Sequence, residues 1–194
     1  MQALPIDFDQ IVVTASRISE EQDKSAASAT IFDRPRIERL GETLVPALLR
    51  LTPSIAVTNQ GPAGLFTEVR IRGAENNHSL LFIDGIRAND PATGDFARFE
   101  LLNADLASRI EIVRGPQSAL WGSQAIGGVI AINGVDAPGL AASAEAGAFG
   151  LLRGSTAAAM GSDRGHLAGA VGWQRATGID SFSGDGDRDG WRNL

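Results

Sequence analysis

A strand, a break, a turn and a second strand near the middle of the chain constrain its fold more than any other feature. Residues 110–113 (IEIV) predict a buried strand, and residues 114–116 (RGP) end it sharply. Residues 118–121 (SALW) predict one helical turn. The glycine pair at 127–128 lets two backbone segments approach closely before a second apolar strand at 129–132. The sequence therefore predicts two buried strands joined by a compact turn.

Composition favours a turn-rich protein that contains β-structure. The chain has 194 residues, of which 43% are hydrophobic, close to the average of about 45–50% for globular proteins. This length suits one large domain, or one domain with a smaller piece. The 23 glycines lie well above the usual share of about 7%.

Charge and the scarcity of soft metal ligands exclude several functions. The 17 basic and 23 acidic residues give a net charge of -6 without any basic cluster, so no nucleic-acid partner is expected. There is no cysteine, and His78 and His166 lie far apart, so neither a disulfide framework nor a zinc site is expected. No apolar run reaches the length of about 18 residues that a membrane helix needs, and the first residues lack a secretory signal. Any membrane contact is therefore expected to use β-strands.

Short helices and strands are predicted between residues 31 and 108. Asp33 can cap a helix that ends before Gly41, and Thr43 can cap a second helix that stops before Pro53. The second helix would pack on a sheet through three leucines on one face, Leu44, Leu48 and Leu51. The predicted strands cover residues 55–58, 68–71 and 80–83, the last turning at Asp84-Gly85 into residues 86–87, and residues 103–108 predict a further short helix.

The C-terminal part consists of small residues in alternation. Three strands of about ten residues, 140–149, 151–160 and 166–176, match the length of transmembrane β-strands. Two sets of side chains fall on opposite faces of the third strand: Leu167, Val171 and Trp173 on one, His166 and Gln174 on the other. An ordinary soluble meander is the alternative.

Three further motifs accompany the central one. They are residues 9–15 (DQIVVTA), 69–73 (VRIRG) and 80–90 (LLFIDGIRAND). In order and spacing, the four together resemble TonB-dependent outer-membrane receptors, and most closely the vitamin B12 (cobalamin) receptors among them. The resemblance covers residues 9–135 well and 139–190 loosely.

The resemblance implies an α+β plug domain, a small mixed sheet with short helices, followed by the first antiparallel strands of a transmembrane β-barrel. It assigns residues 1–30 to a flexible N-terminal arm, 31–135 to the plug and 139–194 to the first barrel strands and an acidic loop. Bacterial barrels need about eight strands or more, so a fragment or truncated product is expected. The implied location is the outer membrane of a Gram-negative bacterium, with the plug inside the barrel and the arm in the periplasm.

The implied function is active uptake of a scarce ligand, cobalamin first and an iron-siderophore second, with energy supplied through TonB. No enzyme is expected, because no catalytic triad can be assembled and residues 122–129 lack the Lys and Ser/Thr of a phosphate-binding loop. The alternative from another class is a soluble periplasmic module that binds calcium or a partner protein.

The arm motif resembles the TonB box, the segment that such receptors offer to TonB. It consists of Asp9, Gln10, Ile11, Val12, Val13, Thr14 and Ala15. A β-prone segment in an otherwise polar arm can add to the edge of a partner's sheet through main-chain hydrogen bonds. The alternative is an edge strand docked on the chain's own sheet.

Two arginines and two loops complete the sites that the resemblance implies. Arg72 and Arg114, each just before a glycine at a strand end, are expected to pair with acidic groups on the barrel wall. The polar loops at residues 59–66 and 88–96 are expected to face the ligand, since loops on a rigid sheet carry recognition. Their candidate contacts are Asn59, Gln60, Phe66, Asn89, Asp90 and Phe96.

A metal site is predicted near the C-terminal end. Residues 185–190 (DGDRDG) match the first half of a calcium loop, with Asp185, Asp187 and Asp189 as ligands. Asp180 is an additional candidate, and cobalamin receptors place aspartate-rich calcium loops in this region. A solvated acidic turn is the alternative, and no cofactor is otherwise required.

Overall fold

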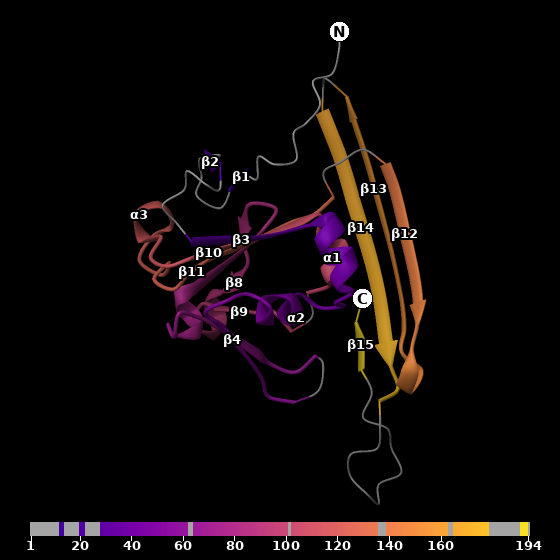
Figure 1. Cartoon of the computed structure of the whole chain (residues 1–194), viewed down its shortest axis with the longest axis horizontal. Coiled ribbons are helices and arrows are strands. Elements are labelled where there is room, and N and C mark those ends of the chain that lie inside the picture. The colour runs from indigo at the N-terminus through magenta and orange to yellow at the C-terminus, as the bar shows by residue number, and fades with distance from the viewer. Residues whose placement is uncertain are drawn as a thin grey trace, which may run out of the picture.

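The chain forms two packed units, a globular unit around a mixed β-sheet and a long antiparallel sheet beside it (Figure 1). The computed structural model describes residues 12–13, 20–21, 28–61, 64–100, 102–135, 139–162, 165–178 and 191–193. We call residues 28–135 the globular unit and strands β12 to β15 the long sheet.

The globular unit mixes short strands with short helices. Its strands are β3 (Ser28–Asp33), β4 (Ile55–Asn59), β5 (Thr67–Ile71), β6 (Ser79–Ile83), β7 (Ile86–Arg87), β8 (Asn89–Asp90), β9 (Phe96–Ala97), β10 (Arg109–Arg114) and β11 (Gly128–Asn133). Its α-helices are α1 (Arg34–Leu40), α2 (Val45–Arg50) and α3 (Ser118–Trp121), and its 3-10 turns are η2 (Asn76–His78), η3 (Pro91–Thr93) and η4 (Ala104–Leu106).

The central sheet has the strand order β3-β10-β11-β6-β7. Strand β10 is antiparallel to β3 and to β11, whereas β11 is parallel to β6. Strands β10 and β11 are the two buried strands predicted around the central break, and α3 is the predicted helical turn. The predicted hairpin is also confirmed, because Asp84 (φ 48°) and Gly85 (φ 78°) take the left-handed conformation that a tight hairpin turn requires.

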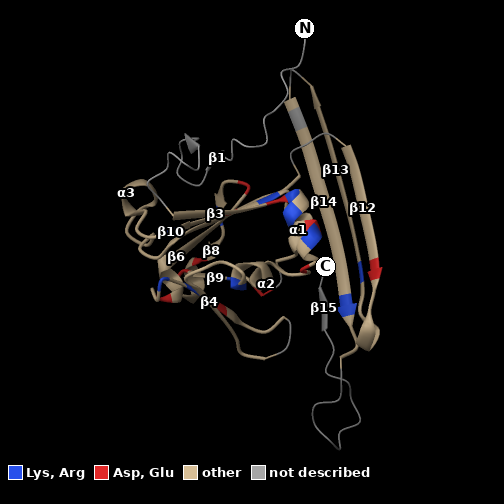
Figure 2. Ribbon diagram, in the orientation of Figure 1, with Lys and Arg blue, Asp and Glu red and all other residues tan. Residues whose placement is uncertain are grey.

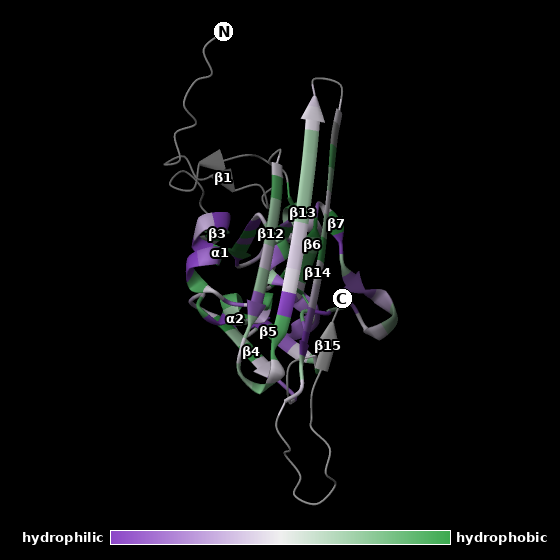
Figure 3. Cartoon of the chain, turned by 90° about the vertical axis from the view of Figure 1, so that its right-hand side faces the viewer, coloured by the Kyte–Doolittle hydropathy of each residue, from purple (hydrophilic) through white to green (hydrophobic). Residues whose placement is uncertain are grey.

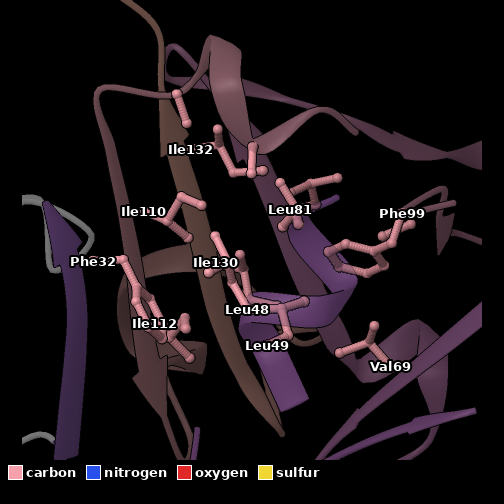
Figure 4. Close-up of a cluster of buried hydrophobic side chains, with 14 of the residues drawn as sticks. Phe32, Leu48, Leu49, Val69, Leu81, Phe99, Ile110, Ile112, Ile130 and Ile132 are labelled. Atoms are coloured by element: carbon pink, nitrogen blue, oxygen red, sulfur yellow. The ribbon is translucent and has the colours of Figure 1, made fainter. Parts of the chain in front are cut away.

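The hydrophobic core lies on both faces of this sheet. On one face, α2, β5 and the segment around Phe99 cover the inward side chains of β10 and β11 (Figure 4). On the other face, α3 covers β6, with the rings of Phe82 and Trp121 4.3 Å apart. Burial of side chains on both faces explains the apolar residues at 110, 112 and 113 of β10 and at 129–132 of β11. The exception inside β10 is Glu111, which is buried and pairs with Arg109 at 2.6 Å.

The two predicted helices form, but α2 begins and packs differently from the prediction. Helix α1 is capped as expected, with Asp33 Oδ1 accepting from the Arg36 amide at 2.9 Å. For α2 the Thr43 cap is wrong: Leu44 is the N-cap residue, held extended by a bridge to Asn103. The predicted face through Leu44, Leu48 and Leu51 is also wrong: Val45, Leu48 and Leu49 are buried, and Leu51 is exposed.

The long sheet pairs β12 (Gly139–Ala146), β13 (Leu152–Ser162), β14 (Gly165–Ala176) and β15 (Trp191–Asn193) in antiparallel order, and η5 (Ala148–Gly150) joins the first two. The exposed large apolar side chains on it include Leu140, Met160, Leu167, Val171 and Trp173. On the inward face Ala157, Ala159 and Gln174 are buried against the globular unit. The predicted division of β14 is confirmed for every residue whose side chain is described.

Polarity along the long sheet is uneven. Figure 3 shows its outward face, which is apolar or neutral over most of β12 and β13. Figure 2 shows that the charged residues of the described strands gather toward the end that carries η5. Among the described residues, no helix has the length and hydropathy that a membrane-spanning helix needs.

Candidate functional site

A salt bridge joins the globular unit to the long sheet. Asp105, in the turn η4, lies with its Oδ1 atom 3.5 Å from Nη1 of Arg153 on β13. The same guanidinium donates through Nε to Glu145 Oε2 on β12 at 3.0 Å. Only 12% of the Arg153 side chain is exposed, so this cation is largely shielded from water between the two units. Partial burial costs both charges part of their hydration, so removal of one partner would leave the other poorly compensated.

A second polar contact between the two units lies on the neighbouring strand, β14. Gln174 Nε2 on β14 donates to Asn103 Oδ1 at the start of η4, and Gln174 is 2% exposed. Close approach here depends on Gly172, because a Cβ atom at that position would lie 3.3 Å from Asn103 Nδ2 and from Leu106 Cδ2. A larger residue at position 172 would therefore require the side chains of Asn103 and Leu106 to shift.

The turn η4 is also held from within the globular unit. Arg34, at the start of α1, donates through Nη1 to the carbonyl oxygens of Asp105 at 2.5 Å and Ala107 at 3.2 Å. Burial raises the pKa of the Asp105 carboxyl, while Arg153 and then Arg34 lower it without cancelling the effect. The turn therefore presents a partly desolvated carboxylate to the long sheet on a fixed backbone.

Sequence reasoning missed this interface. Arg153 is the one charged residue on the inward face of an otherwise small-residue strand, at a position that alternates with outward Leu152 and Gly154. That alternation was a usable signal for Arg153. Nothing in the sequence pointed to Asp105 or Asn103, because their role comes from where η4 lies relative to β13 and β14.

A cavity of about 740 Å³ extends beside the same turn. The globular unit lines it with Val45, Ile83 and Leu106 among others, and β14 lines it with residues 168–170 (AGA). Small side chains on the strand leave this space open between the two units.

The two predicted arginines lie together, at the opposite side of the globular unit. Arg114 donates through Nη1 to the Pro53 carbonyl at 2.9 Å and through Nε to the Ser28 carbonyl at 3.3 Å. A Cβ atom at Gly115 would lie 2.7 Å from Arg72 Nη1, so the Arg72 side chain runs across this glycine. Figure 1 places α3, which follows Arg114, on the side away from β12 to β14.

The positive charges of Arg72 and Arg114 lie close enough to affect each other. Burial, and then the charge of Arg72, lower the pKa of the Arg114 guanidinium. Within the described ranges, no carboxylate forms an ion pair with Arg72 or Arg114. Their contact with acidic groups of a barrel wall remains a prediction.

The structure brings the two predicted ligand loops together through their aromatic residues. The rings of Phe66 and Phe96 lie 6.1 Å apart at an interplanar angle of 47°, and both are partly exposed. Asp95, next to Phe96, binds Arg87 Nη2 at 2.9 Å, and Gln124 hydrogen-bonds to both side chains. This network fixes the second loop against the segment that follows α3.

The polar candidates of these loops differ in what they can offer to a ligand. Asn89 is buried, and its amide serves the fold by accepting from the Leu81 amide at 2.9 Å and donating to the Ser79 and Asp95 carbonyls. Asp90 Oδ1 accepts from the Ala92 amide at 2.9 Å. Asn59 accepts from Arg50 at 2.9 Å, and Gln60 is exposed at the end of the β4–β5 hairpin.

Of the arm motif the structure describes only Val12 and Val13, and of the predicted calcium ligands it describes none. Val12–Val13 form β1, which pairs antiparallel with β2 (Glu20–Glu21) in a two-stranded sheet that is separate from the central sheet. The other motif residues, Asp9, Gln10, Ile11, Thr14 and Ala15, lie outside the described residues. So do Asp180, Asp185, Asp187 and Asp189, and the described part of the chain holds no cluster of three His, Asp or Glu residues that could bind a metal ion.

Comparison with known proteins identifies relatives of the globular unit first. Residues 21–129 match the family model described as the TonB-dependent Receptor Plug Domain. The "Vitamin B12 transporter BtuB" of Vibrio vulnificus (strain YJ016) is 36% identical over 129 residues, which is 66% of this chain and 21% of that protein. The chain thus spans about a fifth of the length of this relative.

Solved structures share the fold. The ferripyoverdine receptor of the outer membrane of Pseudomonas aeruginosa matches 86% of this chain and 23% of its own, with a TM-score of 0.70 and 18% identity. The siderophore receptor PiuA of Acinetobacter baumannii matches 87% of this chain and 23% of its own, with a TM-score of 0.67 and 22% identity. Both matches extend beyond the mixed sheet into the long sheet, because each covers more of the chain than the globular unit does.

Proposed function

This chain belongs to the TonB-dependent receptor plug domain family, and on that premise we propose that it supplies the plug and the first wall strands of an outer-membrane receptor. The receptor would bind a scarce small molecule at the outer face, and force from TonB on the N-terminal arm would move the plug to admit it. The long sheet would be part of the barrel wall.

The seating of the globular unit on the long sheet carries this proposal. The inward face of the sheet contacts the turn η4 through Arg153 and Gln174, while Leu140, Met160 and Leu167 on the outward face are 80%, 67% and 69% exposed. A strand with one face packed on a plug and one apolar face left open suits a wall between lumen and lipid. A soluble sheet would instead expose mainly polar side chains.

Cobalamin is the first proposed ligand, and an iron-siderophore is the second. The wording of the arm motif and the 36% identity to a vitamin B12 transporter support cobalamin. The fold neighbours described as siderophore receptors support the alternative. Phe66 and Phe96 offer flat apolar surface to either ligand at the loop ends. Calorimetry with cyanocobalamin and with a ferric siderophore decides between them, and binding of neither would reject both.

The arm is proposed to bind TonB by strand addition. Val12→Pro removes a backbone donor and fixes φ, so energy-dependent uptake should be lost while ligand binding is kept. Ala26→Pro, which changes the arm outside the motif, is the control and should transport normally. Uptake by the Val12→Pro receptor at the wild-type rate would contradict the assignment of residues 9–15.

Calcium is proposed to bind at Asp185, Asp187 and Asp189, on the strength of their alternate spacing. Asp187→Asn removes one negative ligand and should weaken calcium binding in calorimetry, whereas Asp163→Asn, an acidic change elsewhere in the chain, should not. Equal calcium affinity of the Asp187→Asn variant and the wild type would remove this site.

A further inference from the structure

We infer that the turn from Asn103 to Leu106 stays bound to β13 and β14 throughout transport, so that the plug moves about this point rather than leaving the wall. The inference rests on the proposed function. It makes Asn103, Asp105, Arg153 and Gln174 positioning residues that keep one side of the plug in place.

The contacts at this turn are costly to separate. Gln174 is 2% exposed and the Arg153 side chain 12%, and each has a partner on η4. Withdrawal of the turn would exchange this hydrogen bond and this shielded ion pair for contacts with water. The fit of η4 against Gly172 adds apolar contact from Leu106.

The turn is also fixed to the plug itself. Arg34 binds the carbonyls of Asp105 and Ala107, and Leu44, which begins α2, forms a bridge with Asn103. Two helices therefore hold the backbone that carries the wall contacts. The turn leads directly into β10, so the anchor is continuous with the centre of the sheet.

Arg72 and Arg114 lie on the opposite side of the globular unit. The two arginines bring like charges together, and Arg114 donates hydrogen bonds to the carbonyls of Ser28 and Pro53. Ser28 is the first residue of β3, an edge strand that pairs only with β10 in the central sheet. Under the proposed function, force from the arm would enter the plug at this edge, while η4 precedes the other end of β10.

A reversible tether across the anchor tests the inference. Asn103→Cys with Gly172→Cys puts one thiol on each side of this contact, where a Cβ atom at position 172 would lie 3.3 Å from Asn103 Nδ2. Loss of free thiols on oxidation shows that the disulfide has formed before uptake is measured. The chain has no other cysteine. In cells that express the complete receptor, the oxidised variant should show no loss of TonB-dependent uptake relative to its reduced form.

Two further pairs make the result decisive. Ser143→Cys with Ser155→Cys joins register partners within the long sheet and is the control for the effect of oxidation alone. Leu106→Cys with Gly172→Cys repeats the tether if the first pair assembles poorly. Loss of uptake on oxidation of either tether, with recovery on reduction and an unaffected control pair, would overturn the anchor. Absence of TonB-dependent uptake by the wild-type receptor would instead overturn the proposed function, and the inference with it.

Discussion

Single residues set the geometry on which the central sheet depends. Gly128 begins β11 with φ of 156°, and a Cβ atom there would lie 2.3 Å from the Val113 carbonyl oxygen. No side chain can be accommodated at that distance without separating β10 from β11. The glycine is therefore required by the strand pairing that builds the core.

Gly128→Ala should lower the free energy of unfolding by about 1–3 kcal/mol, since it forces a strained backbone or a shifted strand. Urea denaturation in detergent, followed by tryptophan fluorescence, measures the change. Gly169→Ala is the matched control, because a Cβ there meets nothing within 4 Å. Equal unfolding midpoints for the two variants would contradict the role of Gly128.

Asp105 should make the stability of the plug depend on pH. Burial raises the pKa of its carboxyl above the ordinary value of 3.8, so the folded state favours the protonated form. The resulting stabilisation is complete below that ordinary value and is lost as pH rises through the folded-state pKa. Asp105→Asn should remove this part of the decline in unfolding free energy above about pH 4.

Unfolding free energies measured across a pH series check this expectation. Glu38→Gln is the control, since Glu38 is an exposed carboxylate on α1 and not on η4. Parallel pH curves for wild type and Asp105→Asn would show that Asp105 does not contribute.

At the scale of elements, the two faces of a strand were easier to predict from sequence than the residue at which a helix begins. The faces of β14 follow from the two-residue period, which backbone geometry imposes on any strand. The start of α2 depended on Leu44 pairing with Asn103, a contact between residues far apart in sequence. A local capping signal at Thr43 could not reveal that contact.

The outward face of β14 provides a test at this scale. Val171 lies in the middle of the strand and is 54% exposed on the apolar face. Val171→Arg should destabilise the membrane-inserted receptor by about 2–4 kcal/mol, as expected for a cation near the bilayer midplane. Unfolding in lipid vesicles measures this loss.

Thr177→Arg, just beyond β14, is the control and should cost much less, because charges near the membrane interface are tolerated. If the two variants are equally stable in vesicles, the outward face does not contact lipid.

At the scale of the whole molecule, the apolar outward face distinguishes a membrane receptor from a soluble module. Leu140, Met160 and Leu167 are all largely exposed on the outward face of the long sheet. We expect the purified protein to associate in water and to be monodisperse in detergent, because a large apolar patch is not stable in contact with water. Light scattering with and without detergent measures this. A monodisperse, detergent-independent protein would favour the soluble periplasmic module.

The sequence by itself determined the local structure: the β10–β11 unit with its break, the Asp84-Gly85 hairpin, the α1 caps and the two faces of β14. Each follows from a backbone preference or a period that acts over a few residues. The tertiary structure alone decided that η4 lies against β13 and β14, that Phe66 meets Phe96, and that Arg72 lies beside Arg114. These contacts join residues distant in sequence. The first depends on how the two units pack and the other two on how separate segments of the globular unit meet, and no short-range pattern encodes either.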